Sequence, residues 1–341
     1  MTPAMTSALP PGKEAKALAE LVDDMLRQLG SSSEPTRARK NVAIKTSLFD
    51  RCIELCRAGA APSPDGKIRT LHHLSCTGGT LIAKCLASMP NTLLLNEVDP
   101  FSKMLYNPDS PKFNPTDLAS LVRMGDRNAS DKVLGELFLG QLRALHSRVV
   151  LEGRRLILRD HSHGQFLFAD EPDGKKSLLA LVRPAYPTCS VVTVRDPLDS
   201  YLSMRDLGWI LFSPTTLDEY CRRYHLFLDA HAGLSIYRYE EFLEAPQVVM
   251  RRLCDQLELP FNETFEQTFD AFKFSGDSGR SGSIIAPRPR RAHGPEVEAL
   301  AGKSSYYLSL CERIGYPALG QAAKMPGKVK TSARNNKKRN K

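Results

Sequence analysis

Short apolar runs alternate with helical patterns along the chain from Ile68 onward. Each apolar run has the length of a strand and is followed by a segment with apolar residues at helical spacing. The predicted strands are residues 68–74, 92–96, 155–159, 190–195 and 234–239, and the predicted helices are residues 80–89, 115–149, a segment from about 197 and further segments after 239. This alternation predicts an α/β fold with a parallel central sheet and helices on both faces. In such folds ligands bind beyond the carboxyl ends of the strands.

The pattern before Ile68 predicts a separate helical segment. Apolar residues recur at helical spacing over residues 14–29, and Gly30 follows as a helix stop. A second amphipathic segment covers about residues 39–58, and residues 60–67 are rich in Pro, Gly and Asp, as a boundary would be. The expected division is an N-terminal helical extension over residues 1–62, an α/β domain over 63–320 and a basic tail over 321–341.

The net charge of +9 comes mainly from the C-terminal tail. The basic residues there are Lys324, Lys328, Lys330, Arg334, Lys337, Lys338, Arg339 and Lys341, with no acidic residue among them. A segment without apolar periodicity cannot offset the entropy of ordering itself, so we expect a disordered, solvated extension. The rest of the chain is nearly neutral and carries no base-reading motif, so we expect no nucleic-acid partner.

The cysteines and the apolar runs indicate a cellular location. Eight cysteines are scattered through the chain, and none forms a C-x-x-C pair, which favours a reducing compartment. The first residues lack an apolar core of signal-peptide length, and no apolar stretch approaches the length of a membrane span. We expect a cytoplasmic protein without a membrane span.

The first predicted strand leads into a candidate phosphate loop, Ser75–Thr80, with the sequence SCTGGT. A loop of small residues between a strand and a helix receives phosphate on backbone N–H groups and on the helix N-terminus. Two glycines beside hydroxyl residues are also common in plain turns. The loop is not a Walker A motif, because Gly79 is followed by Thr80 where that motif has lysine.

A second strand-end motif lies at residues 191–205, VVTVRDPLDSYLSMR. Arg195 ends an apolar strand and Ser203 follows two helical turns later, so both can hold a second phosphate. The alternative is a surface ion pair between Arg195 and either Asp196 or Asp199.

Together the two motifs resemble the sulfotransferase superfamily, which has a P-loop-type α/β fold. Arg195, Asp196, Pro197 and Ser203 match the R-D-P-x-x-x-x-x-S pattern that holds the 3′-phosphate of the donor in that superfamily. Met89 and Pro90, which end the first helix, look like the same element in the tyrosylprotein and carbohydrate branches. The resemblance covers residues 67 to about 315 and implies 3′-phosphoadenosine 5′-phosphosulfate as the sulfuryl donor.

The resemblance also implies the residues that bind this donor. Tyr239, in the segment YRYEEF, corresponds to an adenine contact, and FSGDSGRSG resembles a glycine-containing loop that closes over the 3′-phosphate. The implied donor-binding residues are Cys76, Thr77, Gly78, Gly79, Thr80, Arg195, Ser203, Tyr239, Ser278, Gly279 and Arg280.

The chain departs from the superfamily pattern at Cys76. The superfamily has lysine or arginine at this position to support the charge that develops on the leaving phosphate, and cysteine cannot supply a positive charge. Arg159 and Lys84 are the candidates to replace it, and we favour Arg159 because Lys84 can equally point along its helix into solvent.

Sulfuryl transfer needs one general base to accept the proton of the acceptor hydroxyl. Glu97 follows the second predicted strand and matches the glutamate base of the tyrosylprotein branch, although an acid after a strand is often a solvated loop residue. His161 follows the third strand and corresponds to the catalytic histidine of the cytosolic branch, with Asp160 or Asp170 to orient it. The predicted catalytic residues are Glu97, His161 and Arg159.

The spacing of the histidines in the sequence does not predict a metal site. His161 and His163 are spaced by two and lack the further partners of a zinc site, and His72 and His73 lie within the first strand, where they are expected to pack or to form hydrogen bonds. We expect no metal.

The leading hypothesis is a sulfotransferase that acts on a hydroxyl-bearing acceptor, such as a saccharide or a small alcohol. Two alternatives stay open: a small-molecule kinase of related fold, weakened by the absence of the Walker lysine, and a non-catalytic nucleotide-binding protein, favoured by Cys76 and the basic tail. The sequence identifies neither the acceptor nor the oligomeric state.

Overall fold

The computed structural model describes Glu20 and residues 66–102, 115–126, 128–168, 171–172, 177–276 and 284–319. The predicted N-terminal helices, apart from Glu20, lie outside these residues, as do Ser278, Gly279, Arg280 and the basic tail. Apart from Glu20, the described residues belong to one unit of the chain, Asp65–Lys341. The account below concerns this unit.

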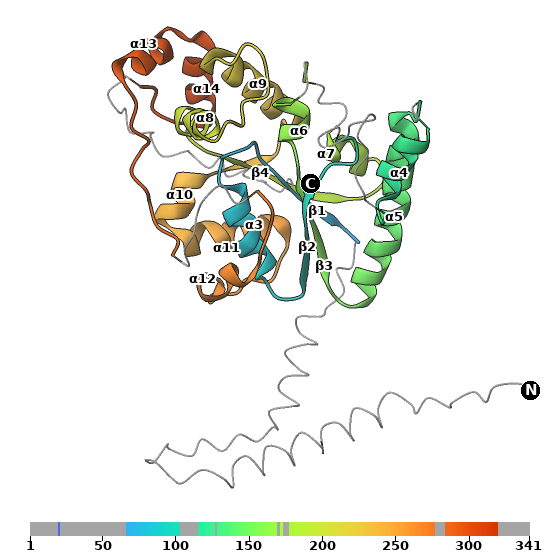
Figure 1. The fold of residues 1–341 in the computed structure, drawn as a ribbon. Helices are drawn as coiled ribbons and strands as arrows, with labels where there is room; N and C mark the ends of the chain where they lie inside the picture. Colours follow the sequence, from blue (N-terminus) through green and yellow to red (C-terminus); the bar gives the residue numbers. More distant parts are fainter. Residues whose placement is uncertain are drawn as a thin grey trace, which may run out of the picture. The chain divides into compact units, whose positions relative to one another are not determined.

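A five-stranded parallel sheet forms the centre of the unit (Figure 1). Its strands are β1 (Ile68–His72), β2 (Thr92–Val98), β3 (Arg155–Asp160), β4 (Thr188–Val194) and β5 (Ser235–Arg238), arranged in the order β2-β3-β1-β4-β5. The central strand β1 is completely buried. From β1 the chain runs to β2 and then to β3 on one side of β1, and it then crosses to β4 on the other side. The strand order therefore reverses next to β1, and folds of this type bind ligands at such a point.

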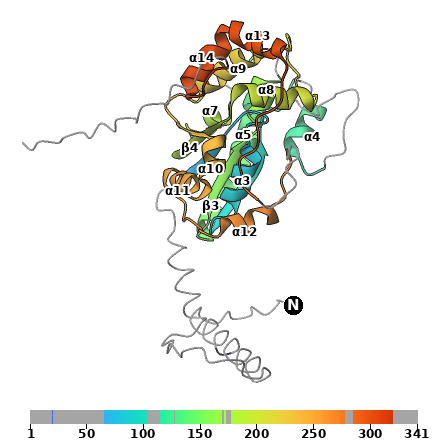
Figure 2. The same ribbon diagram turned by 90° about the vertical axis from the view of Figure 1, so that its left-hand side faces the viewer.

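Helices cover both faces of the sheet because alternate residues of each strand point to opposite faces. Leu71, Ile157 and Val191 face one apolar core, which is covered by α3 (Gly79–Ala87), α10 (Tyr239–Glu244), α11 (Pro246–Leu257) and α12 (Phe265–Thr268). Figures 1 and 2 show this group of helices on the same side of the sheet.

The opposite face carries two further apolar cores. Ile68, Leu156 and Leu158 pack with α5 (Asp131–Leu151) and α7 (Leu178–Val182). Val192 and Val194 pack with a group of helices that Figures 1 and 2 both show at one end of this unit. These helices are α6 (His163–Phe166), α8 (Pro197–Asp206), α9 (Leu217–Ala230), α13 (Pro295–Lys303) and α14 (Ser305–Ile314).

The helix predicted over residues 115–149 is two helices, so this prediction was wrong. α4 (Leu118–Gly125) ends at Asp126, and α5 begins after Ser130, whose hydroxyl accepts a hydrogen bond from the backbone N–H of Val133. A helix-breaking glycine followed by polar residues that prefer cap positions explains the interruption.

The predicted fold class is confirmed: the unit is a P-loop-like α/β domain with a parallel sheet between two helical layers. Among the described helices, none combines the length and the apolar character needed to cross a bilayer.

Candidate active site

A cavity of about 940 Å³ lies where the five strands end. Every strand contributes to its wall through the residues at or after its carboxyl end. The polar residues among these are Ser75 and Cys76 after β1, Glu97 and Asp99 from β2, Arg159 and His161 from β3, Arg195 and Asp196 after β4, and Tyr239 and Glu240 after β5. The structure thus brings most of the described site residues predicted from the sequence to one place.

The phosphate loop adopts its shape through glycine. Gly78 has a φ of +83° and forms the N-cap of α3, so the first turn of this helix opens into the cavity. A Cβ on Gly78 would lie 2.1 Å from the Tyr239 ring, and one on Gly79 would lie 2.4 Å from the His73 ring. The Thr77 hydroxyl stabilises the loop by donating a hydrogen bond of 2.7 Å to the carbonyl of Leu74. Glycine is therefore required here for close packing of two rings as well as for backbone conformation.

Cys76 contributes backbone rather than charge to the loop. Its φ is +61°, and its carbonyl accepts a hydrogen bond of 2.9 Å from Nη1 of Arg195. Burial raises the pKa of the Cys76 thiol, so the side chain stays neutral near pH 7. The positive charge that this loop position lacks has to come from another strand.

Arg159 brings such a charge to the loop from β3. The side chain is 3% exposed, and its Nη2 donates to the Thr80 hydroxyl at 2.8 Å. Its Nε donates to Nε2 of His73 at 2.8 Å, and its Nη1 donates to the Asn96 side chain and lies 3.7 Å from Oε1 of Glu97. Lys84, the other candidate, is on α3 and is not among the residues that line the cavity.

His73 lines the cavity and forms hydrogen bonds there, one of the two roles that the sequence predicted for it. Burial, and next the Arg159 guanidinium, hold the pKa of His73 well below its ordinary value. Its Nδ1 lies 3.0 Å from the carbonyl of Leu74, so the proton of the neutral ring is on Nδ1 and Nε2 accepts from Arg159. His73 thus orients Arg159 without adding charge.

Glu97 lies at the end of β2 with a strained backbone, at a φ of +54°. Its carboxylate accepts a hydrogen bond of 2.5 Å from the Ser275 hydroxyl, and a Cβ on Gly276 would lie 2.2 Å from Oε1. The Gly276 carbonyl accepts from the Thr80 hydroxyl at 3.0 Å, so this segment contacts Glu97 and the phosphate loop together. The Glu97 side chain is 19% exposed and reaches the cavity.

His161 lies in the same wall beside His163, with their ring centroids 3.5 Å apart. Its Nδ1 is 3.7 Å from Oδ2 of Asp99, a residue that the sequence analysis missed. Burial, and then His161 and Arg159, hold the pKa of His163 well below its ordinary value. Asp160 does not orient His161, because its carboxylate contacts His72 instead.

Arg195 follows β4 and lies in the part of the cavity wall that is formed after β4 and β5. Besides the Cys76 carbonyl, its Nε lies 3.9 Å from Oε1 of Glu240, and its guanidinium lies 5.6 Å from the centre of the Tyr239 ring. The alternative pairing with Asp196 or Asp199 is not what the structure shows. Those two carboxylates contact Arg290 at 2.5 Å and 3.4 Å, so Arg195 faces the cavity.

Ser203 lies on α8 with 3% exposure, and its hydroxyl accepts from Nη2 of Arg291 at 3.0 Å. Arg288, Arg290 and Arg291 all line the cavity, and none of them was predicted. The segment PRPRR, with three arginines within four residues, was the available signal. Ser278, Gly279 and Arg280, which were expected to bind the 3′-phosphate, lie outside the described residues.

Comparisons with known proteins give the following. No family model matches the chain, and no curated protein matches it. Among solved structures, the sulfotransferase domain of the Synechococcus PCC 7002 olefin synthase is 19% identical, with a TM-score of 0.40 and coverage of 74% of this chain and 94% of that one. A sulfotransferase from Alicyclobacillus acidocaldarius is 14% identical, with a TM-score of 0.38 and coverage of 73% and 96%.

Mouse sulfotransferase SULT7A1 complexed with PAP is 12% identical, with a TM-score of 0.33 and coverage of 68% of this chain and 75% of that one. These three solved structures are described as sulfotransferases.

Proposed function

We propose that the chain is a sulfotransferase that uses 3′-phosphoadenosine 5′-phosphosulfate to sulfate a hydroxyl group. The observation that carries the proposal is the direct hydrogen bond from Arg195 to the carbonyl of Cys76. It joins the phosphate loop to the second strand-end motif along one cavity wall. A donor with phosphate groups at both its 5′ and 3′ positions fits a cavity with two separate anion-binding regions.

The two regions suit the two ends of this donor. The opening of α3 at Gly78 offers backbone N–H groups and the positive end of a helix to the 5′-phosphosulfate. Arg195, Ser203 and Arg291 offer two guanidinium groups and a hydroxyl to the 3′-phosphate. Tyr239, packed beside Gly78, is proposed as the adenine contact.

The residues at the ends of β2 and β3 suit the transfer step. Glu97 accepts the proton of the acceptor hydroxyl. In the same step the hydroxyl oxygen forms a bond to sulfur, and the bond between sulfur and the phosphate oxygen of the donor breaks. Arg159, held by His73 and bonded to Thr80, stabilises the negative charge that develops on the leaving phosphate. The products are a sulfate ester and adenosine 3′,5′-bisphosphate. His161 is the second candidate for the base.

The acceptor side of the cavity combines polar and apolar groups. Oδ2 of Asp99 and Nδ1 of His163 are buried and, within the described part of the chain, have no hydrogen-bond partner. Trp209 and Leu211, 40% and 53% exposed, line the same cavity. An acceptor with several hydroxyl groups and an apolar face, such as a saccharide, satisfies both kinds of surface.

A cytoplasmic location is part of the proposal. The cysteines of the described residues (Cys76, Cys85, Cys189, Cys221, Cys254 and Cys311) are all free thiols. Free thiols are typical of proteins in reducing compartments.

Cys76 also favours a second candidate function, a nucleotide-binding protein without transferase activity. A loop without its own cation holds phosphate by backbone groups but stabilises a leaving group less well. This candidate predicts that replacement of Glu97 and His161 leaves both nucleotide affinity and biological role unchanged.

Calorimetric titration tests the proposed donor class. Adenosine 3′,5′-bisphosphate is titrated into the wild type and into Arg195→Ala, in parallel with ATP and ADP in the presence of Mg²⁺. Arg148→Ala is the matched control, because Arg148 is 74% exposed and pairs with Glu152 on α5. Binding of the bisphosphate that requires Arg195 but not Arg148, with weak ATP binding, supports the proposal. Preference for ATP with Mg²⁺ contradicts it and favours a kinase.

A further inference from the structure

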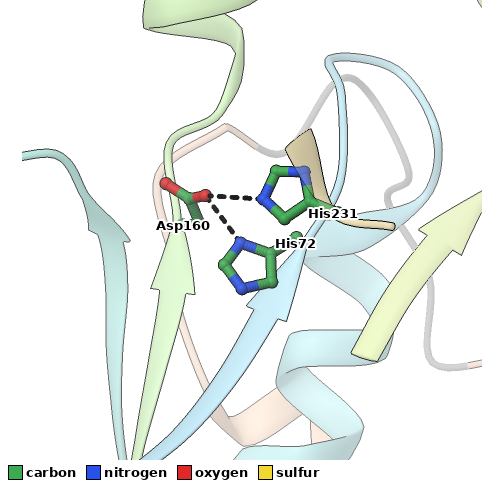
Figure 3. Close-up of side chains that lie close together, drawn as sticks. All are labelled: His72, Asp160 and His231. Atoms are coloured by element: carbon green, nitrogen blue, oxygen red, sulfur yellow. Dashed lines mark hydrogen bonds and ion pairs between the residues drawn. The ribbon is translucent and has the colours of Figure 1, made fainter. Parts of the chain in front are cut away.

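His72, Asp160 and His231 form a buried cluster (Figure 3). His72 ends β1, Asp160 ends β3 and His231 follows α9, and the three residues are 0%, 0% and 3% exposed. None of them lines the cavity. The catalytic proposal therefore does not account for this cluster.

Each histidine of the cluster uses one ring nitrogen for an outward hydrogen bond. Nε2 of His72 lies 2.7 Å from the Thr70 hydroxyl, which donates onward to Ser190. Nδ1 of His231 lies 2.8 Å from the Phe227 carbonyl, which can only accept. Nδ1 of His231 therefore carries the ring proton, and its Nε2 carries a lone pair. The Thr70 hydroxyl can either accept from or donate to Nε2 of His72, so both tautomers of this ring are compatible with its contacts.

One ring nitrogen of each histidine points at the same carboxylate, as Figure 3 shows. Nδ1 of His72 is 2.7 Å and Nε2 of His231 is 3.9 Å from Oδ2 of Asp160. Lone pairs facing a carboxylate repel unless a proton or a cation lies between them. A proton on Nδ1 of His72 resolves only one of the two contacts.

Two atoms of the cluster stay unsatisfied with a proton alone. Oδ1 of Asp160 and Nε2 of His231 are buried and have no hydrogen-bond partner among the described residues. Buried polar atoms in native structures are almost always paired, so each such atom needs an explanation. A divalent cation bound to all three side chains gives Nε2 of His231 a partner.

We propose that His72, Asp160 and His231 bind a structural Zn²⁺ ion. Two imidazole nitrogens and one carboxylate oxygen suit zinc rather than magnesium or calcium. The ligand atoms lie within 4.8 Å of one another. With bond lengths of about 2.0–2.2 Å, two ligands of a tetrahedral zinc lie roughly 3.4 Å apart. The His72–Asp160 contact thus opens and the His231–Asp160 contact closes by a fraction of an ångström.

The surroundings already provide the outer contacts of a metal site. Metal-bound histidines usually donate their second ring N–H to a carbonyl or another oxygen, and ligating carboxylates are themselves hydrogen-bonded. His231 donates to the Phe227 carbonyl, and the Thr70 hydroxyl lies in position to accept from His72. The Ser162 hydroxyl donates to Oδ2 of Asp160 at 2.9 Å. The ion would link β1, β3 and the end of α9, and a water molecule can complete its coordination.

The zinc content of the full chain tests the proposal. The protein is unfolded, refolded with either zinc or a chelator, freed of loose metal and analysed for bound zinc and melting temperature. We expect about one zinc per chain and a higher melting temperature after refolding with zinc. His231→Gln should lose both, whereas His146→Gln, which removes another buried histidine on α5, should keep both.

X-ray absorption by the zinc-loaded wild type provides a test that needs no variant. It should show two imidazole ligands and oxygen. If the wild type refolded with zinc retains none and melts as it does with the chelator, the proposal is wrong and the cluster is an imidazolium–carboxylate pair. Equal zinc content in His231→Gln, or a spectrum without imidazole, also overturns it. None of these measurements depends on sulfotransferase activity.

Discussion

The two halves of the cavity obtain their positive charge in different ways. Around β4 and α8, Arg195 belongs to the same short motif as Ser203 and contacts the loop directly, and Arg291 adds a second guanidinium at Ser203. Around β1, the phosphate loop has a neutral cysteine, and its cation, Arg159, comes from β3. The difference suggests a division of labour. Substitutions on the β4 side should change donor affinity, and those on the β2–β3 side should change the rate of transfer.

Glu97→Gln should give the largest effect. Loss of the base should lower kcat by about 10²–10⁴-fold, while bisphosphate affinity changes little, because Glu97 lies on the acceptor side of the proposed reaction. Single-turnover kinetics and calorimetry measure the two quantities. His161→Gln is the companion variant, and a larger loss of kcat there than in Glu97→Gln would transfer the role of base to His161.

Arg159→Met should lower kcat by about 10²–10³-fold, the range for loss of one preorganised charge-stabilising donor. Arg159→Lys should recover part of the rate, since lysine keeps the charge but cannot bond to Thr80 and His73 with the same planar group. A melting curve for each variant separates this effect from misfolding. If Arg159→Met reduces bisphosphate affinity as strongly as kcat, the proposed division between the two halves fails.

Arg195→Ala should weaken bisphosphate binding by about 10–100-fold, as expected for loss of a charged hydrogen bond worth about 1.5–3 kcal/mol. The value of kcat at saturating donor should stay close to that of the wild type, because the arginine binds ground state and transition state alike. If Arg195→Ala binds the bisphosphate normally but has a reduced kcat, the β4 side acts in transfer rather than in donor binding.

Gly78→Ala should lower stability by about 1–3 kcal/mol, because the new Cβ would overlap the Tyr239 ring and the backbone has a positive φ. Thermal unfolding measures this effect. Gly140→Ala is the control, since a Cβ at this position in α5 meets nothing within 4 Å and alanine favours a helix. If both variants melt alike, close packing of the loop against Tyr239 is not required.

The reactivity of Cys76 should show the smallest effect. Burial raises the pKa of its thiol, so the thiolate forms at a higher pH than in a free cysteine. Alkylation at pH 7 should be slow and should accelerate as the pH rises toward that raised pKa, with the modified residue located by mass spectrometry. Rapid alkylation at pH 7 would mean that Cys76 is a thiolate. The contrast between a neutral cysteine in the phosphate loop and the arginines on the β4 side would then be wrong.

The sequence alone determined what depends on neighbouring residues. Alternating apolar runs from Ile68 predicted the parallel sheet, and small residues after a strand predicted the turn from β1 into α3. A strand, a turn and a helix N-terminus that follow one another are encoded in consecutive residues. Arg195 was found for the same reason. Local patterns also misled in one place, since apolar periodicity over residues 115–149 hid the break between α4 and α5.

Only the tertiary structure decided which distant residues meet. The parallel pairing of β1 with β3, in which Leu71 lies opposite Arg159, brings Arg159 to Thr80 and Asp160 to His72. The contact of Arg291 with Ser203 likewise joins residues far apart in sequence. Strand order and register follow from the packing of the whole core. No short motif encodes them, so the contacts of Arg159 with Thr80 and His73, and the histidine cluster, became visible only in the folded chain.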